Sequence, residues 1–397
     1  MAKLADKLHC SGCSACFAIC PDSAISMQRD SEGFVYPIVD ENACINCGLC
    51  EKVCPSIHDF FSRTPLSVFA AKAKDDGLRL ESSSGGVFSL LAYNVLNRGG
   101  LVFGASFDPF DWHVSHECID NESELGRLRG SKYVQSDMNN CFRRVKKSLN
   151  DGREVLFSGT PCQIAGLRAY LSQTCKSDMS KLLCVDVVCH AVPSTIVWKK
   201  YLEKRIKEYY NQRAIGLDAI KRIASRHKGC GWKRFSMFLS FANDMEYRNI
   251  FRNDSFMRGF LQELYNRPSC YNCGFKNLSS GSDITLGDYW GIESKFPEID
   301  DDKGISLVFV NTVKGAEVFD SLSDKLEKNV SDFEDAIKRN PAVVKPSSPH
   351  RNRMRFFSQV NKCKDFDMLV EQMLKLPMRT RFRIFAGKCL RKLGIHR

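Results

Sequence analysis

Two cysteine runs near the start of the chain constrain its fold more than any other feature. Residues 10–21 read CSGCSACFAICP and residues 44–55 read CINCGLCEKVCP, so the pattern Cys-x-x-Cys-x-x-Cys-x-x-x-Cys-Pro occurs twice at an offset of 34 residues. In this pattern the first three thiolates bind one four-iron cluster and the fourth reaches the other cluster, so the two runs fold as one unit. The expected ligand sets are Cys10, Cys13, Cys16 and Cys54 for one 4Fe-4S cluster, and Cys44, Cys47, Cys50 and Cys20 for the other.

The residues around these cysteines suit the same chemistry. Small residues such as Gly12 and Gly48 let backbone N–H groups approach the negatively charged sulfurs. The segment between the runs alternates in polarity, which predicts a β-hairpin with its turn at residues 31–33. Residues 1–60 therefore resemble a bacterial-type two-cluster ferredoxin domain of α+β fold, in which no cysteine of the pattern is missing. The complete pattern disfavours the alternative of structural or zinc-binding cysteines.

The rest of the composition indicates the cellular compartment in which these thiols are found. The chain has 397 residues and 19 cysteines, and its first residues, MAKLADKLHC, contain no apolar secretion signal. No window reaches the run of about 18 apolar residues that a membrane span needs. In a reducing cytosol, clustered thiols indicate metal ligands rather than disulfides. We therefore expect a cytoplasmic protein of two or three folded units.

The formal net charge of +12 is concentrated at the C-terminus. From Arg351 to Arg397 there are thirteen Lys or Arg residues and three acids, which leaves the rest of the chain nearly neutral. Residues 346–397 are predicted to form a helical, basic, amphipathic tail. Two interpretations are open: peripheral docking on an anionic membrane or an acidic partner, and a solvated appendage. Since no recognised nucleic-acid-binding motif accompanies the charge, we expect no nucleic-acid partner.

The body repeats one local plan of a strand, a turn of small residues and a helix. This plan over residues 66–215 predicts an α/β unit with helices packed on a mainly parallel sheet. Loops at the strand C-terminal ends suit the phosphates of a dinucleotide, whereas helix capping and an exposed basic pair are the alternatives, and GxGxxG is absent. The candidate cofactor residues in these loops are Ser84, Gly85, Gly86, Arg129, Gly130, Ser131, Lys132, Ser158, Gly159, Thr160 and Pro161.

An isolated Cys-x-x-Cys pair lies in the second part of the body, residues 216–345. Cys270 and Cys273, in RPSCYNCGFK, supply only two of the four donors that a cubane or a zinc site needs. Cys162, after the SGTP turn, and Cys189, after the apolar strand LLCVDVV, stand at strand ends where the other two ligands would assemble. A third 4Fe-4S cluster, a redox dithiol, inert buried cysteines and Cys230 as a competing ligand all remain open here.

Three further residues are candidates for the same region. Asp283 and Asp288, in SDITLGDYWGIE, suit contacts with a flavin or a substrate hydroxyl, and turn formation is the alternative. His190, beside Cys189, is the candidate catalytic proton donor to a reduced acceptor, because histidine exchanges protons near neutral pH. A structural histidine is the alternative.

Seven segments in order resemble the family of beta subunits of coenzyme F-420 hydrogenases and dehydrogenases over residues 65–312. They are SSSGGVFS, RGSKYVQS, FSGTPCQIAGL, VDVVCHAVPS, FMRGF, RPSCYNCGFK and DITLGDYWGIE, with CHAVPS in place of the expected CHGVPS. The resemblance implies an iron–sulfur flavoprotein that binds FAD. It implies that Cys162, Cys189, Cys270 and Cys273 bind a third cluster, and that the Ser-Gly-Gly, RGSK and SGTP loops contact the flavin.

We therefore predict an oxidoreductase that takes electrons from a donor protein or reduced ferredoxin. They pass through the 4Fe-4S clusters to FAD and on to a small-molecule acceptor. The resemblance implies that the acceptor is of the coenzyme F-420 type or, in bacteria, an unidentified substrate linked to polysaccharide synthesis. The main alternative is a non-catalytic electron-transfer subunit docked on a catalytic partner, and a zinc site with a structural role is a third interpretation.

Overall fold

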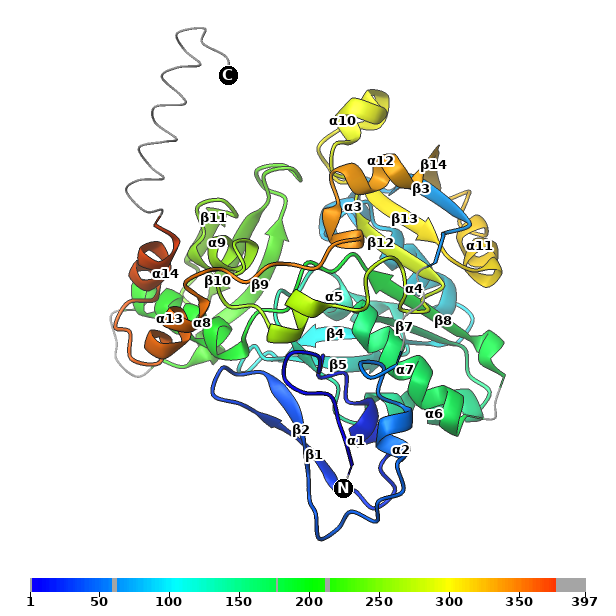
Figure 1. Ribbon diagram of the computed structural model, residues 1–397. Helices are drawn as coiled ribbons and strands as arrows, with labels where there is room; N and C mark the ends of the chain where they lie inside the picture. Colours follow the sequence, from blue (N-terminus) through cyan, green and yellow to red (C-terminus); the bar gives the residue numbers. More distant parts are fainter. Residues whose placement is uncertain (1, 59–62, 176–177, 211–214, 376–397) are drawn as a thin grey trace, which may run out of the picture.

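The N-terminal unit is built around the two cysteine runs. The computed structural model of the protein describes residues 2–58, 63–175, 178–210 and 215–375 (Figure 1). Helices α1 (Ala15–Ile19) and α2 (Leu49–Lys52) each lie inside a run and follow a residue in the left-handed conformation, Ser14 and Gly48. Strands β1 (Ile25–Arg29) and β2 (Val35–Val39) pair in antiparallel register between the runs, which confirms the predicted hairpin.

A nine-stranded sheet forms the centre of the body, in the order β14-β3-β13-β12-β8-β7-β4-β5-β6. Its strands are β3 (Ser67–Ala73), β4 (Leu101–Phe107), β5 (Val114–Ile119), β6 (Ser136–Asp137), β7 (Val155–Gly159), β8 (Leu182–Val187), β12 (Ile284–Asp288), β13 (Ser306–Val310) and β14 (Leu326–Ser331). The four central strands β12, β8, β7 and β4 are parallel neighbours, whereas β14, β3, β13 and β12 pair antiparallel, as do β4 and β5. The predicted α/β body is thus present, with its parallel strands at the centre of a mixed sheet.

Helices cover both faces of this sheet. Helices α3 (Asp76–Glu81), α4 (Val87–Leu96), α5 (Leu125–Leu128) and α11 (Val313–Asp320) contribute to the apolar core on one face. Helices α6 (Cys141–Asn150) and α7 (Pro161–Thr174) contribute to the core on the other face, which also contains Cys13, Cys16 and Cys50 of the N-terminal unit. Beside β13, helices α10 (Ile292–Lys295) and α12 (Phe333–Lys338) close a smaller core. The N-terminal unit and the body therefore share one core.

A second, three-stranded sheet packs beside the main one. Strands β9 (Ile220–His227), β10 (Ser236–Phe241) and β11 (Glu246–Ile250) are antiparallel and lie next to helices α8 (Thr195–Tyr209) and α9 (Ser255–Leu261) (Figure 1). Helices α13 (Arg353–Val360) and α14 (Phe366–Leu374) complete this lobe. None of the helices that the structure describes is both long and apolar enough to cross a membrane.

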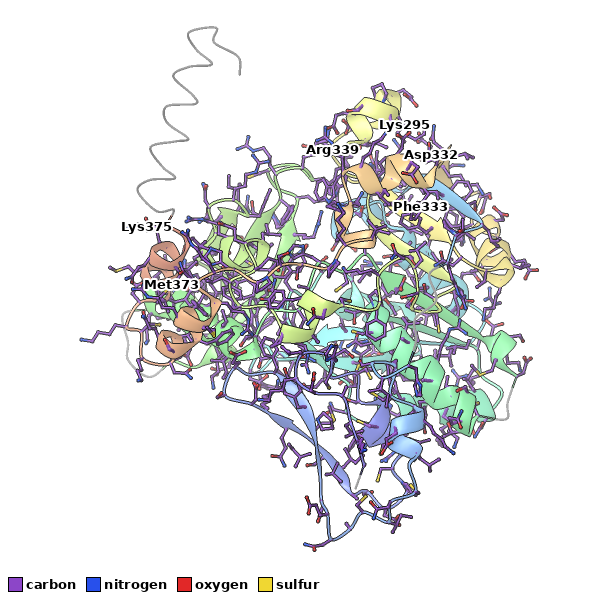
Figure 2. The ribbon with its side chains drawn as sticks, in the orientation of Figure 1. Lys295, Asp332, Phe333, Arg339, Met373 and Lys375 are labelled. Atoms are coloured by element: carbon purple, nitrogen blue, oxygen red, sulfur yellow. The ribbon has the colours of Figure 1, made fainter. Side chains whose placement is uncertain are left out.

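The structure describes only the first part of the predicted C-terminal tail, residues 346–375. Phe356, Phe366 and Met373 are buried in the core of the second lobe, whereas Lys375 is exposed. Figure 2 labels Met373 and Lys375 near the C-terminal end of α14. The buried Arg205 on α8 pairs with Asp367 on α14. Residues 346–375 are therefore part of the folded body rather than a solvated appendage. The rest of the predicted tail, from Leu376 to Arg397, lies outside the described residues.

The contact between α7 and Cys13 holds the N-terminal unit against the body. Gly166 lies in the middle of α7, and a Cβ atom placed there would be 2.8 Å from Cys13 Sγ and 3.0 Å from Cys13 Cβ. Glycine within a helix costs about 1 kcal/mol relative to alanine, so this approach requires a residue that the helix itself disfavours. On α6, Arg143 donates to the Ala18 and Phe17 carbonyls at 2.9 and 3.0 Å and reinforces the contact.

We expect Gly166→Ala to lower the thermal unfolding midpoint of the loaded protein and to weaken retention of iron. The added methyl group overlaps Cys13, and overpacking of this kind costs about 1–3 kcal/mol. Gly126→Ala is the matched control, since Gly126 is also helical but its Cβ position faces open space. Equal unfolding midpoints and equal iron contents for the two variants would show that the contact is not tight.

Candidate metal centres

Four cysteines surround a pocket at the outer end of the N-terminal unit, which we call the distal site. Cys20, Cys44, Cys47 and Cys50 line this pocket together with Ile45 and Gly48. They are the set that the crossed pattern predicts, with three ligands from the second run and one from the first. Cys47 is exposed, whereas Cys50 is buried. The distal site is therefore open to the surface on one side.

The other four cysteines of the two runs form the proximal site, defined by Cys10, Cys13, Cys16 and Cys54. Burial raises the pKa of the Cys13 thiol, and the nearby Cys54, Cys10 and Cys162 sulfurs raise it further. Burial likewise raises the pKa of Cys16, whose sulfur is close to those of Cys13, Cys10 and Cys54. Buried thiols of this kind become good donors only when a metal takes up the thiolate charge. The donor set therefore fits a four-iron cluster.

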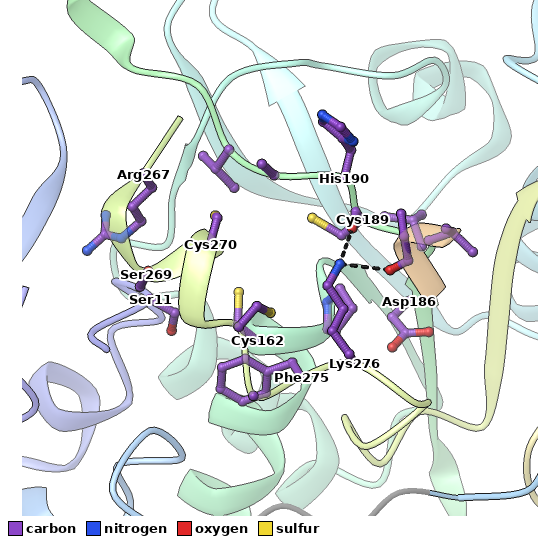
Figure 3. A pocket seen from close by; sticks show the side chains of 18 of the residues that line it. Ser11, Cys162, Asp186, Cys189, His190, Arg267, Ser269, Cys270, Phe275 and Lys276 are labelled. Carbon is purple, nitrogen blue, oxygen red and sulfur yellow. Dashed lines mark hydrogen bonds between the residues drawn. The ribbon is translucent and has the colours of Figure 1, made fainter. Parts of the chain in front are cut away.

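A third group of cysteines lines a pocket inside the body, which we call the third site. Cys162, Cys189, Cys270 and Cys273 all line it, and Figure 3 shows the first three of them around the same space. They come from the first turn of α7, the loop after β8 and the short turn Pro268–Asn272 with the residue that follows it. Burial, together with the Cys273 sulfur, raises the pKa of the Cys270 thiol to about 12. Four half-buried cysteines around one pocket fit a further cluster.

The local sequence explains how these segments reach one place. Thr160 and Gln163 form a reciprocal capping box at the start of α7, in which Gln163 Oε1 accepts from the Thr160 N–H at 2.9 Å. This cap ends β7 at the sheet edge and presents Cys162, whose Sγ is 3.1 Å from Thr160 Oγ1. The predicted residues Ser158, Gly159, Thr160 and Pro161 thus position a sulfur of the third site.

The three sites follow one another through the protein. His9 and Ser11 of the N-terminal unit line the third-site pocket. The Cys162 sulfur is close enough to the Cys13 sulfur to raise the pKa of the Cys13 thiol. The distal site adjoins the proximal site because the two share the crossed runs. The spatial order is therefore distal, proximal, third. Each cysteine that the structure describes is a free thiol, and Cys230 is exposed rather than part of the third-site pocket.

The predicted flavin loops lie at another part of the sheet edge, where two of them meet. The Ser83 hydroxyl accepts from the Ser131 N–H at 2.8 Å, and Ser306 Oγ accepts from the Gly85 N–H at 3.0 Å. Gly86 has a φ of 87° and precedes the first turn of α4. Gly130, with a φ of 82°, has open space at its Cβ position. The structure therefore brings the SSSGG and RGSK loops together.

The two cations of the RGSK loop already have protein partners. Arg129 donates to Ser89 Oγ at 3.1 Å and pairs with Glu81. Lys132 Nζ donates to the carbonyl oxygens of Arg127 and Arg129 at 2.9 and 2.7 Å, and burial lowers its pKa to about 7. These contacts do not support the predicted phosphate clamp by Arg129 and Lys132, because both side chains are directed at protein groups.

The two candidate aspartates lie at opposite ends of β12. Asp283 precedes the strand, is buried, and accepts from Arg168 Nη2 at 3.0 Å and the Cys184 N–H at 2.8 Å. This position, away from the strand C-terminal ends, does not support the predicted contact of Asp283 with a flavin. Asp288 ends the strand on the expected side, where both its oxygens accept from Arg226, at 2.6 and 3.0 Å.

His190 lines the third-site pocket, as does its neighbour Cys189. Its Nε2 atom lies 2.8 Å from Glu263 Oε1 without the alignment of a hydrogen bond, and its ring meets Phe260 edge-on. Glu263 has a φ of 62°, which a non-glycine residue rarely adopts. The candidate proton donor is thus held beside the third site, next to a carboxylate.

Two buried cations at the third site were not among the predicted residues. Arg267 and Lys276 flank the Cys270 pair in sequence and line the same pocket (Figure 3). Lys276 Nζ donates to the carbonyl oxygens of Cys189 and Ala342 at 2.8 and 2.7 Å. The sequence signal that could have identified them is their position on either side of the pair in RPSCYNCGFK, since cations beside thiolates favour the charged form.

Comparison with known families identifies two parts of the chain. Residues 152–336 match the C-terminal part of the family "Coenzyme F420 hydrogenase/dehydrogenase, beta subunit", and residues 9–57 match a 4Fe-4S dicluster domain. The protein is thus an iron–sulfur protein of electron transfer. It belongs to the family of coenzyme F420 hydrogenase/dehydrogenase beta subunits, with a dicluster domain fused in front, as the sequence motifs predict.

Individual relatives are distant. The F subunit of the "F(420)H(2) dehydrogenase" of Methanosarcina mazei is 23% identical over 341 residues, which are 80% of this chain and 83% of that protein. "Coenzyme F420-dependent sulfite reductase" of Methanocaldococcus jannaschii is 25% identical over 170 residues, 42% of this chain and 26% of that protein. A chain of the F420-reducing NiFe hydrogenase complex from Methanosarcina barkeri aligns with a TM-score of 0.47 and 16% identity, over 72% of this chain and 93% of that chain.

We expect the double variant Cys270→Ser, Cys273→Ser to lose about four of about twelve irons per chain when both proteins are purified anaerobically, because half of the third ligand set is removed. Iron, sulfide and zinc analysis measures this change. Cys230→Ser is the control and keeps the full content, since Cys230 is exposed and away from the pocket. About eight irons in the wild type would leave the pair as a dithiol or a zinc site.

Proposed function

We propose that the protein is an iron–sulfur flavoprotein oxidoreductase in which three clusters carry single electrons between a protein donor and FAD. The observation that carries the proposal is the order of the three four-cysteine groups, with the proximal site between the other two. FAD, when bound, supplies the conversion between single electrons and electron pairs that an organic acceptor requires. The residues of the chain position the cysteine ligands, exclude water from the buried sites and hold the protons that accompany electron transfer.

Electrons enter at the distal site. Its cysteines include the exposed Cys47, and Ile45, which lines the same pocket, is 64% exposed. Asp22 also lines this pocket and is exposed. A protein donor therefore approaches most closely here, where an apolar contact and a carboxylate are both available. The proximal site is enclosed by comparison, since Cys10, Cys13 and Cys16 are all buried.

FAD is assigned to the loops at the C-terminal edge of the sheet. The first turn of α4 follows Gly86, and a helix N-terminus attracts phosphate through its backbone N–H groups and its dipole. The open space at Gly130 leaves room beside the same loops. Because Arg129 and Lys132 already bind protein groups, we assign the phosphate contacts to the backbone rather than to these side chains.

The organic redox partner of the flavin is assigned from the chemistry of the site and from the names of the relatives. His190 lies beside the third site next to Glu263, so a proton is available where electrons arrive. The names of the relatives contain coenzyme F420, so we assign this coenzyme as the organic compound that exchanges electron pairs with the flavin. A second candidate function is an electron-transfer subunit without its own acceptor site. The Methanosarcina mazei relative favours it, because that protein is named as one subunit of a dehydrogenase.

We expect the anaerobically purified chain to contain about one FAD and to reduce coenzyme F420, followed by the loss of its absorbance, when a chemical reductant supplies electrons to the clusters. When an oxidant withdraws electrons from the clusters, the reduced coenzyme is oxidised instead and the absorbance returns. His190→Gln should lower this turnover while dye reduction is retained, because dyes accept electrons without the proton. Absence of flavin from holoprotein with all its iron would contradict the flavoprotein proposal. Dye reduction without turnover of the coenzyme would favour the role of an electron-transfer subunit.

A further inference from the structure

Arg267 lies between the proximal and third sites and is 1% exposed. It directly precedes the turn Pro268–Asn272, which carries Cys270, and it lines the third-site pocket. Its side chain leaves this pocket toward the N-terminal unit (Figure 3), where Nη2 is 4.0 Å from Cys10 Sγ. One side chain therefore touches a cysteine of the proximal site while its backbone begins a ligand segment of the third site.

Each nitrogen of the guanidinium group donates to an oxygen atom, and all three of these oxygens are neutral. Nε donates to the Cys10 carbonyl, Nη1 to Gln135 Oε1 and Nη2 to the Val35 carbonyl, each at 2.9 Å. The Tyr36 ring lies 4.3 Å from the guanidinium carbon and covers another side of the group. These contacts fix the geometry, but no carboxylate of the described residues is among the partners to balance the charge.

A buried positive charge without a counter-charge is costly, so buried charges in proteins are paired or lie beside a metal centre. The negative charge available to Arg267 is that of cysteine thiolates on both sides. Cys10 Sγ of the proximal site is 4.0 Å from Nη2, and Cys270 of the third site lies in the turn that Arg267 directly precedes. A cluster held by four thiolates is itself an anion, and each added electron makes it more negative.

We propose that Arg267 is a positioning residue that sets the reduction potential of the proximal cluster, by placing its buried positive charge against Cys10. The inference rests on the proposed assignment of clusters to the proximal and third sites. The charge stabilises the reduced cluster more than the oxidised one, because the reduced form carries the extra negative charge. It also lowers the repulsion between electrons held on adjacent clusters, so that transfer toward the third site proceeds with both partly reduced.

The test is a redox titration of the anaerobic, full-length protein, followed by electron paramagnetic resonance of the reduced clusters. For Arg267→Gln we expect the ratio of reduced to oxidised proximal cluster at a fixed potential to fall about tenfold, which is a midpoint about 59 mV lower for one electron. Arg267→Lys keeps the charge and should recover most of this change. A proximal midpoint equal to that of the wild type in Arg267→Gln, with iron retained, would overturn the proposal.

Two control variants separate the effect of the Arg267 charge on the midpoint from its effect on the attachment of the N-terminal unit. Arg143→Gln removes an arginine that also binds the N-terminal unit through carbonyl oxygens, at Ala18 and Phe17, and should leave the midpoints unchanged. If Arg267→Gln does not retain the proximal cluster, the result for Arg267→Lys decides between a charge effect and a structural clamp. Recovery of cluster and midpoint supports the proposal, and loss of the cluster in both variants overturns it in favour of a structural clamp. A wild-type content of about eight irons would instead contradict the third cluster of the proposed function, whatever Arg267 does.

Discussion

The close packing of Cys13 against Gly166 on α7 is the contact on which the arrangement of the metal centres depends. It lets the N-terminal unit share an apolar core with the main sheet, so the two parts are not joined by a linker alone. It also places the proximal site beside Cys162, which lies four residues before Gly166 on the same helix. Without this contact the distal and proximal sites would be a separate carrier. With it the proximal site lies directly beside the third site of the body.

The sequence predicts the local elements of this fold better than their pairing. The hairpin β1–β2 and the helix starts at Thr160 and Gly86 follow from short-range chemistry, namely alternation, caps and glycine. The antiparallel strands beside the parallel centre do not, because strand neighbours such as β3 and β13 are far apart in the chain. The basic C-terminal region shows the same limit. Its charge pattern is that of a surface segment, yet Phe356 and Met373 complete a core whose other members come from α8, α9 and the second sheet.

For the candidate site, the grouping of cysteines was accessible from spacing and from strand ends. The crossed pattern places Cys20 with the second run, and the pocket at the distal site contains that set. Cys162 and Cys189 could be connected with the distant Cys270 pair because strand C-terminal ends meet at one edge of a sheet. The cations were harder to assign. Arg129 and Lys132 look like phosphate ligands in sequence but are used internally, whereas Arg267, an ordinary residue in sequence, is buried between two metal centres. Burial of a charge depends on tertiary neighbours that no local pattern contains.

The chain order of the ligands has a consequence for biosynthesis. All eight cysteines of the distal and proximal sites have left the ribosome once residue 54 has emerged, whereas the third site is incomplete until Cys273 has followed. More than two hundred residues of translation therefore separate the first complete ligand sets from the last. Because α7 and the Arg267 turn are also made late, the early unit must persist before its docking surface exists. The four cysteines of the third site are accordingly the last of the candidate ligand sets to be completed along the chain.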